Sequence, residues 1–284
     1  MIETMCVKAG DGVAAGVRYR KRISSPEAAA ARSGSEPPER PSTPESIIFV
    51  HGVGSTAAIW DYQLRDLCDR YDCYAIELRG NGAIGPPPDP SMITRAGFVN
   101  DVLAVADAAD SPHFHFVGCS LGGVVGFELW QRVPEQIASL TVVGSFAKYP
   151  NSEAYVANIE AAVGAAESME LFAEERSAKL GLPLARLAET LAQMSCKTIP
   201  SYLASTRATW TGDYRAMLST ISVPTLVICG ERDRIAPLPL SQEIAAGIPG
   251  ARLEVLPGAG HVSNADTPAA FNKLLREFLA TTPL

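Results

Sequence analysis

Short apolar runs separated by amphipathic stretches dominate the chain from Ser46 onward. The runs are rich in Val, Ile, Leu and Phe and lie at 47–50, 73–76, 114–117, 140–143, 225–229 and 253–256. Continuous apolar runs of this length predict strands buried on both faces, and the stretches between them predict helices. Strands that alternate with helices are typical of a mostly parallel sheet covered on both sides, so the pattern predicts an α/β fold.

Three segments depart from this alternation. Residues 1–22 alternate polar and apolar positions around Asp11-Gly12, a dipeptide suited to a hairpin turn, which predicts an opening antiparallel hairpin. Residues 24–45 collect Pro, Ser, Ala and charge, and we interpret them as a mobile surface loop. Across 147–218 the apolar spacing becomes helical, which predicts a helical lid inserted into a core made of 1–146 and 219–284.

Composition narrows the classes of partner. The 284 residues are 47% apolar, enough for a large core, and the net charge of −7 without a basic block argues against binding to nucleic acid or anionic membrane. No apolar run reaches the ~18 residues that span a bilayer, and the first residues lack the pattern of a signal peptide. We therefore expect a cytoplasmic protein with a small-molecule partner. The six cysteines form no CxxC pair, which favours reduced thiols.

The strongest chemical signal is Gly118-Cys119-Ser120-Leu121-Gly122, which follows the apolar run at 114–117 and precedes a helical stretch. Gly-x-Ser-x-Gly between a strand and a helix predicts a sharp turn that presents the serine hydroxyl at the edge of a sheet. The two glycines are expected because strand and helix approach too closely for side chains there. Ser120 is the candidate nucleophile, whereas Cys119 beside it is expected to point into the fold.

A serine hydroxyl needs a base within hydrogen-bond reach. His113 and His115 approach the serine's own strand and cannot fold back onto it, and His51 opens a different loop. His261 lies in a glycine-rich loop directly after the apolar run at 253–256, where a side chain can face a cleft at the carboxyl end of a strand. His261 is therefore the candidate base.

The acid that orients the base should follow another strand. The run at 225–229 leads into Gly230-Glu231-Arg232-Asp233-Arg234, which offers two carboxylates. Asp233 lies deeper in the loop and is flanked by arginines, so it is the first candidate, and Glu231 is the next. The segment after 140–143 offers no carboxylate.

The order Ser120, Asp233, His261 is the chain order of α/β-hydrolases. Together with His51-Gly52, the Gly118–Gly122 turn and Gly260-His261, the chain resembles that superfamily from about Ser46 to its end. The resemblance implies a mostly parallel sheet flanked by helices, an inserted helical lid, and an oxyanion hole made by the backbone N–H groups of Val53 and Leu121. It also implies that His51 braces its loop. Asn81 stands where the family usually has a histidine.

Particular motifs narrow the resemblance. Ser120 differs from the aspartate nucleophile of epoxide hydrolases and haloalkane dehalogenases, and Val53-Gly54-Ser55 differs from the Ser-Gly-Pro loop of carbon–carbon hydrolases. Trp60-Asp61-x-Gln63 and His261-Val262-Ser263-Asn264 are similar to 3-oxoadipate enol-lactonases. The candidate substrate contacts are Trp60, Met194, Tyr202 and Trp210, with Arg207 as a weaker one.

These observations predict a serine hydrolase that cleaves a small carboxylic ester or lactone through an acyl-enzyme, without metal or organic cofactor. Two alternatives stay open. One is a carbon–carbon bond hydrolase that uses the same triad, and the other is a ligand-binding relative that does not turn substrate over. The sequence is silent on oligomeric state.

Overall fold

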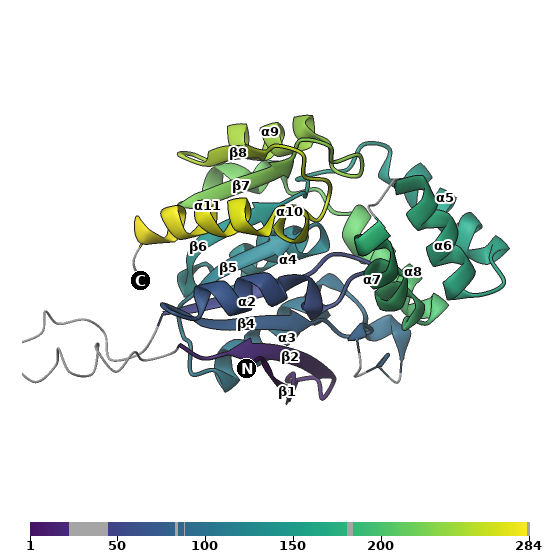
Figure 1. Cartoon of the computed structure of the whole chain (residues 1–284), viewed down its shortest axis with the longest axis horizontal. Helices are drawn as coiled ribbons and strands as arrows, with labels where there is room; N and C mark the ends of the chain where they lie inside the picture. The colour runs from purple at the N-terminus through teal and green to yellow at the C-terminus, as the bar shows by residue number, and fades with distance from the viewer. Residues whose placement is uncertain (23–44, 83–84, 88, 181–183, 283–284) are drawn as a thin grey trace, which may run out of the picture.

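The computed structural model describes residues 1–22, 45–82, 85–87, 89–180 and 184–282. The loop predicted at 24–45 lies outside the described residues, apart from Glu45. The described strands form one eight-stranded sheet in the order β1-β2-β4-β3-β5-β6-β7-β8 (Figure 1). Their bounds are β1 (Glu3–Lys8), β2 (Ala14–Arg20), β3 (Ser46–Val50), β4 (Asp72–Glu77), β5 (Phe114–Cys119), β6 (Ile137–Val143), β7 (Thr225–Gly230) and β8 (Arg252–Leu256).

Every strand predicted from an apolar run is present, within a few residues of the predicted bounds. Strands β3 to β8 pair in parallel, whereas β1 and β2 form the predicted hairpin and β2 joins β4 in antiparallel register. The carboxyl ends of the parallel strands therefore meet at one edge of the sheet, where the loops after β3, β5, β7 and β8 gather the candidate site residues.

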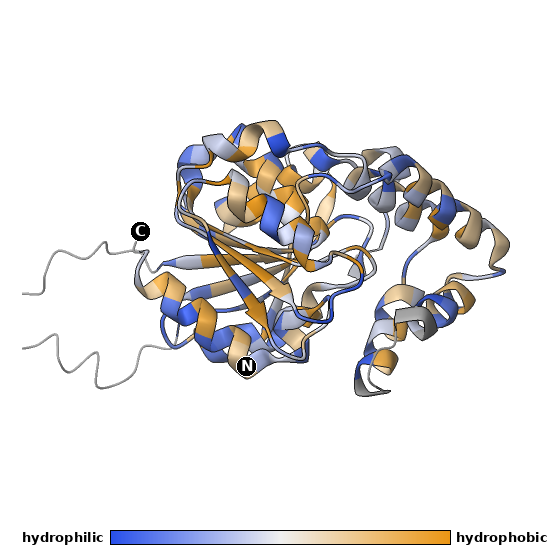
Figure 2. Cartoon of the chain, turned by 90° about the horizontal axis from the view of Figure 1, so that it is seen from above, coloured by the Kyte–Doolittle hydropathy of each residue, from blue (hydrophilic) through white to orange (hydrophobic). Residues whose placement is uncertain are grey.

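Helices cover both faces of the sheet. On one face lie α2 (Asp61–Leu67) and α11 (Pro268–Ala280), and on the other lie α3 (Arg95–Ala108), α4 (Leu121–Arg132) and α9 (Leu238–Gly247). In α11 the buried residues recur at helical spacing, which gives this helix one apolar face: Phe271, Leu274, Leu275, Phe278 and Leu279. Figure 2 shows the hydrophobic residues concentrated on the strands and on the inward helix faces. The apolar side chains therefore pack into two cores, one on each face of the sheet.

Among the described residues, four α-helices lie between β6 and β7, in the stretch where the sequence spacing turned helical: α5 (Ser152–Ala165), α6 (Met169–Leu180), α7 (Leu184–Ser195) and α8 (Ile199–Trp210). We call residues 152–210 the inserted segment. It lies beyond one end of the sheet and has a small apolar core of its own, which includes Ile159, Val163 and Phe172 (Figure 1). The segment therefore covers the edge at which the parallel strands end.

A buried ion pair fixes the loop after β4. Arg79 is 2% exposed and donates to both carboxylate oxygens of Asp101 on α3, and its Nη1 lies 2.7 Å from Asp11 in the hairpin turn. A guanidinium can satisfy several acceptors at once because its donors form a rigid fork. These contacts hold the hairpin, the loop after β4 and α3 together. None of the described helices is both long and apolar enough to cross a membrane.

Candidate active site

Ser120 occupies a strained backbone position between β5 and α4. Its φ of 54° and ψ of −111° are rare for a residue with a side chain, and such strain persists only where the surroundings hold it. Its N–H donates to the carbonyl of Val143 at 2.9 Å, and the Ser145 hydroxyl donates to its carbonyl at 2.8 Å. The next strand, β6, thus fixes the turn that carries Ser120.

Gly118 and Gly122 are required by contact rather than by dihedral angle. A Cβ at Gly118 would overlap the backbone carbonyl of Gly122, and a Cβ at Gly122 would overlap the carbonyl of Val50 at the end of β3. The strand-to-helix approach expected from the sequence is therefore present, and it brings the loop after β3 against the serine turn.

His261 and Asp233 lie in contact. The Nδ1 atom of His261 is 2.8 Å from Oδ2 of Asp233, while Oδ1 of Asp233 accepts from the N–H groups of Ile235 and Ala236, each at 2.9 Å. A carboxylate only accepts hydrogen bonds, so Nδ1 of His261 donates to Asp233, and in the neutral ring the lone pair lies on Nε2. This tautomer suits a base.

Glu231, the other candidate acid, faces elsewhere. Its carboxylate accepts the N–H of Gly258 at 2.8 Å. Gly144, which follows β6, packs against the acid–base pair, and a Cβ there would lie 3.0 Å from Oδ2 of Asp233. The absence of a side chain at Gly144 therefore leaves room for Asp233 and His261 at the end of β6.

The two predicted oxyanion donors flank the serine. Leu121 is the first residue of α4, and a Cβ at Gly52, next to Val53, would lie 3.0 Å from the Cβ of Ser120. Within the described part of the chain, neither the Val53 nor the Leu121 N–H has a hydrogen-bond partner. Two unpaired N–H groups beside a serine hydroxyl can stabilise a developing negative charge on oxygen.

His51 braces the Val53 loop. It is fully buried, the N–H of Leu78 donates to its Nε2 at 3.3 Å, and its Nδ1 lies 2.8 Å from the carbonyl of Gly52. Since Nε2 accepts, Nδ1 must donate to Gly52. Burial, helped by the positive charge of Lys197, lowers the pKa of His51 to about 3, so the ring is neutral. His51 therefore holds the backbone at Gly52, next to Val53, against the loop after β4.

Asn81, which replaces the family's usual histidine, is buried and paired on both ends of its amide. Its Nδ2 donates to the carbonyls of Leu78 and Arg79, each at 3.1 Å, and its Oδ1 accepts from the Nζ of Lys197. Lys197 comes from the inserted segment and also donates to the carbonyl of Ser55. The substitution therefore creates a partner for a buried lysine, which the sequence alone did not indicate.

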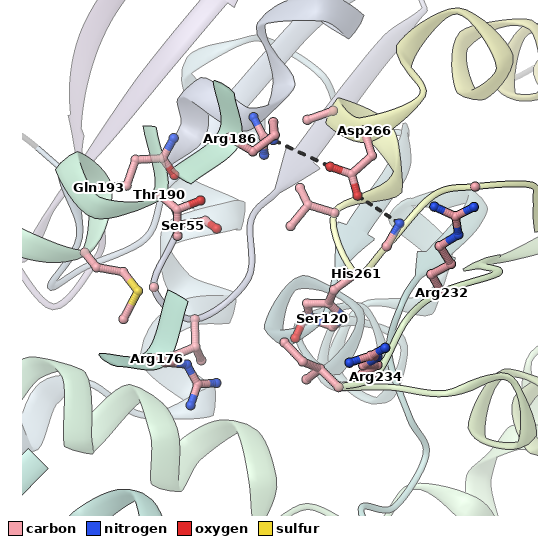
Figure 3. A pocket seen from close by; sticks show the side chains of 18 of the residues that line it. Ser55, Ser120, Arg176, Arg186, Thr190, Gln193, Arg232, Arg234, His261 and Asp266 are labelled. Atoms are coloured by element: carbon pink, nitrogen blue, oxygen red, sulfur yellow. Dashed lines mark hydrogen bonds and ion pairs between the residues drawn. The ribbon is translucent and has the colours of Figure 1, made fainter. Parts of the chain in front are cut away.

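A cavity of about 580 Å³ opens over these groups and is lined by both Ser120 and His261 (Figure 3). In the described part of the chain no hydrogen bond joins the Ser120 hydroxyl to His261, and catalytic hydrogen bonds are often long without bound substrate. Two predicted substrate contacts, Met194 and Trp210, line this cavity, as does Val53. The inserted segment thus supplies one wall.

Three other predicted contacts do not reach the cavity. Trp60 is fully buried below the sheet, with its ring 5.1 Å from Phe49 and 6.1 Å from that of Phe271. Tyr202 packs edge-on against Phe172 inside the inserted segment. Arg207 has a largely exposed side chain, 65%, and pairs with Glu160. For Trp60 and Tyr202 the structure corrects the expectation, because large aromatic side chains pack within the apolar clusters of their own segments. Arg207, the weaker candidate, is solvated.

Cys119 points into the fold. Its side chain is 1% exposed, and burial raises the pKa of its thiol far above the usual range. The thiol therefore stays protonated and unreactive, as expected. All six cysteines are free, and four of them are buried. No three His, Cys, Asp or Glu side chains of the described residues converge as a metal site would require.

A buried amide network behind His261 was not anticipated. The Gln63 side chain donates to the backbone carbonyl of Asn264 at 3.1 Å and to Oδ1 of Asn272 at 2.6 Å, and the Asn264 amide donates to the carbonyl of Ile59 at 2.8 Å. Gln63 and Asn264 belong to the two motifs that resembled enol-lactonases. The resemblance of these two motifs was the sequence signal that could have indicated the network. The network ties the loop of His261 to α2.

Comparison with known proteins identifies the family of the chain. Residues 47–274 match the family described as "Alpha/beta hydrolase family". The chain belongs to this family. Among curated members, it is 29% identical over 236 residues to 3-oxoadipate enol-lactonase 2 of Acinetobacter baylyi, covering 80% of this chain and 85% of that protein. Other relatives carry the name carbamate hydrolase RutD, marked as provisional. The RutD of Variovorax paradoxus is 29% identical over 250 residues, covering 84% of this chain and 93% of the relative.

Solved structures of other alpha/beta hydrolases have the same architecture. A hydrolase from Pseudomonas aeruginosa PA01 is similar with a TM-score of 0.81 and 29% identity, covering 98% of each chain. The enol-lactonase from Burkholderia xenovorans LB400 has a TM-score of 0.79 at 23% identity, covering 97% of this chain and 100% of that chain. At 23% identity, the similarity to the enol-lactonase shows the shared fold alone.

Proposed function

We propose that this alpha/beta hydrolase cleaves small carboxylic esters or lactones through an acyl-enzyme on Ser120. The observation that carries the proposal is the convergence of three parts on one cavity: a strained serine, a histidine held by Asp233, and two unpaired N–H groups at Val53 and Leu121. Each part has a defined role in acyl transfer.

The reaction follows from these roles. The Oγ of Ser120 attacks the carbonyl carbon while Nε2 of His261 takes the hydroxyl proton, and Asp233 stabilises the imidazolium that forms. The carbonyl oxygen becomes negative and receives hydrogen bonds from Val53 and Leu121, which are worth ~3 kcal/mol each in such sites. The C–O bond of the substrate then breaks, and His261 protonates the departing oxygen. Water next attacks the acyl carbon while His261 takes its proton, the bond to Oγ of Ser120 breaks, and His261 returns the proton to Oγ, which releases the acid.

Residues 152–210 act as a lid in this proposal. Met194 and Trp210 give the cavity an apolar wall, so the acyl group would lie against the inserted segment while its carbonyl faces the sheet edge. The division expected from the sequence, a core of 1–146 and 219–284 and a lid of 147–218, is part of the proposal. Excluding water from this cavity would strengthen the hydrogen bonds to the oxyanion.

The test measures acid release at constant pH over a panel of lactones, enol-lactones and linear esters, with the native chain and Ser120→Ala side by side. We expect multiple turnovers by the native chain and a loss of about 10⁶-fold in kcat for the variant. A vinylogous diketone in the panel separates carbon–carbon cleavage from ester hydrolysis. A native chain that binds panel members without turning any of them over would refute the proposal and leave a ligand-binding protein.

A further inference from the structure

The cavity above Ser120 is cationic in a chain whose net charge is −7. Four arginines line it: Arg176, Arg186, Arg232 and Arg234 (Figure 3). Among the described lining residues Asp266 is the sole carboxylate. It accepts the N–H of Gly260 at 2.9 Å and lies 3.5 Å from Nε of Arg186, which also forms an ion pair with Glu189 outside the lining. An excess of positive charge inside a cleft attracts anions because the low-dielectric walls focus the field.

Arg176 differs from the other three in its surroundings. It is carried by α6 and partly buried, and its neighbours are the phenol groups of Tyr155, Tyr149 and Tyr202. Within the described residues it forms no ion pair with a carboxylate. A guanidinium has five N–H donors and keeps its proton, so a phenol oxygen satisfies only part of it. A desolvated cation without an anion is unfavourable, and a bound anion removes that cost.

We propose that Arg176 binds a free carboxylate of the substrate, so that the esters or lactones cleaved at Ser120 carry a second, ionised carboxyl group. This inference rests on the function proposed above. A planar guanidinium holds a carboxylate through two parallel hydrogen bonds. Met194 and Trp210 line the same cavity and would contact the hydrocarbon between the carboxylate and the ester. The exposed Arg232 and Arg234 would attract the anion toward the opening.

The test uses two esters of equal acyl length, the para-nitrophenyl monoester of glutaric acid and para-nitrophenyl pentanoate. The first carries a free carboxylate and the second is neutral. For the native chain we expect a higher kcat/KM with the anionic ester. In Arg176→Gln the ratio of the two kcat/KM values should fall by about 10- to 100-fold, since charged hydrogen bonds are worth ~1.5–3 kcal/mol. Arg176→Lys, which keeps the charge, should give an intermediate ratio and serves if the glutamine variant fails to fold.

The matched control is Arg207→Gln, which removes a charge from the inserted segment outside the cavity and should leave the ratio unchanged. Equal kcat/KM values for the two esters in the native chain, or a ratio that does not fall in either Arg176 variant, would overturn the carboxylate site. The proposed function would survive that result, because the neutral ester would still be cleaved.

If neither ester is cleaved, the proposed function fails and binding decides the inference. Glutarate should raise the melting temperature of the native chain and of Arg207→Gln, but not that of Arg176→Gln. A rise of this kind supports the carboxylate site without catalysis. No rise in the native chain overturns it.

Discussion

The Nζ atom of Lys197 lies 3.1 Å from the backbone carbonyl of Ser55 and donates a hydrogen bond to it. Lys197 lies between α7 and α8 of the inserted segment and is 5% exposed, whereas Ser55 follows the loop that carries Val53. A buried ammonium group therefore joins the segment that covers the cavity to the loop that supplies a proposed oxyanion donor. Asn81 accepts a second hydrogen bond from the same group.

Lys197 should make the free energy of unfolding depend on pH. Burial lowers its pKa from 10.5 to about 7, against the opposing effect of Glu77, with His51 and Cys196 also nearby. Below about pH 7 both states hold the proton. Between about pH 7 and about pH 10 only the unfolded state holds it, so stability rises with pH by up to ~1.4 kcal/mol per unit.

Urea unfolding of the native chain and Lys197→Met at about pH 7, 8 and 9 measures this slope. We expect the slope to be smaller in the methionine variant. Lys273→Met is the control, because Lys273 is a largely exposed lysine of α11. Parallel stability curves for the native chain and Lys197→Met would show that the buried lysine does not titrate in this range.

Asp233→Asn should reduce kcat by about 10⁴-fold, the size known for the same change in a serine protease triad. The asparagine amide would donate to Nδ1 of His261 and so place the ring proton on Nε2, where it cannot accept from Ser120. The neighbouring Glu231→Gln keeps an oxygen for the N–H of Gly258 and should retain kcat within about two-fold. The opposite ranking in a steady-state ester assay would make Glu231 the acid.

Gly118→Ala should destabilise the fold by ~3 kcal/mol or more, because the added methyl group overlaps the backbone of Gly122 and neither strand nor helix can move easily. Gly164→Ala is the matched control. Gly164 lies in α5 with open space around it, so alanine there should raise stability by up to ~1 kcal/mol. Thermal and urea unfolding compare the two. Similar stabilities for both variants would mean that the serine turn tolerates a side chain.

Gln63→Met should lower the free energy of unfolding by ~1–3 kcal/mol, because it leaves the buried carbonyl of Asn264 and the amide of Asn272 without a donor. Hydrogen exchange across residues 257–266 should become faster, since the network anchors the loop of His261. Gln242→Met on the exposed side of α9 should change neither quantity. Unchanged exchange in Gln63→Met would show that the loop is held by other contacts.

Local chemistry made much of the architecture predictable. The strands could be read from apolar runs because a strand buried on both faces needs them, and the turn at Ser120 could be read because Gly118 and Gly122 are a steric requirement. The choice of Asp233 over Glu231 was also made from position in the loop, and its carboxylate lies 2.8 Å from His261.

The sequence by itself determined the fold class, the strands and the serine turn, because each depends on residues close together in the chain. It also determined the order in which the three proposed catalytic residues occur. Only the tertiary structure decided which side chains reach the cavity. It buried Trp60 against Phe271, kept Tyr202 inside the inserted segment, and brought Arg176 to the wall near Ser120. It also joined Lys197 to Ser55. Such contacts depend on which faces of distant helices and loops meet, and helical periodicity gives a face without giving its partner.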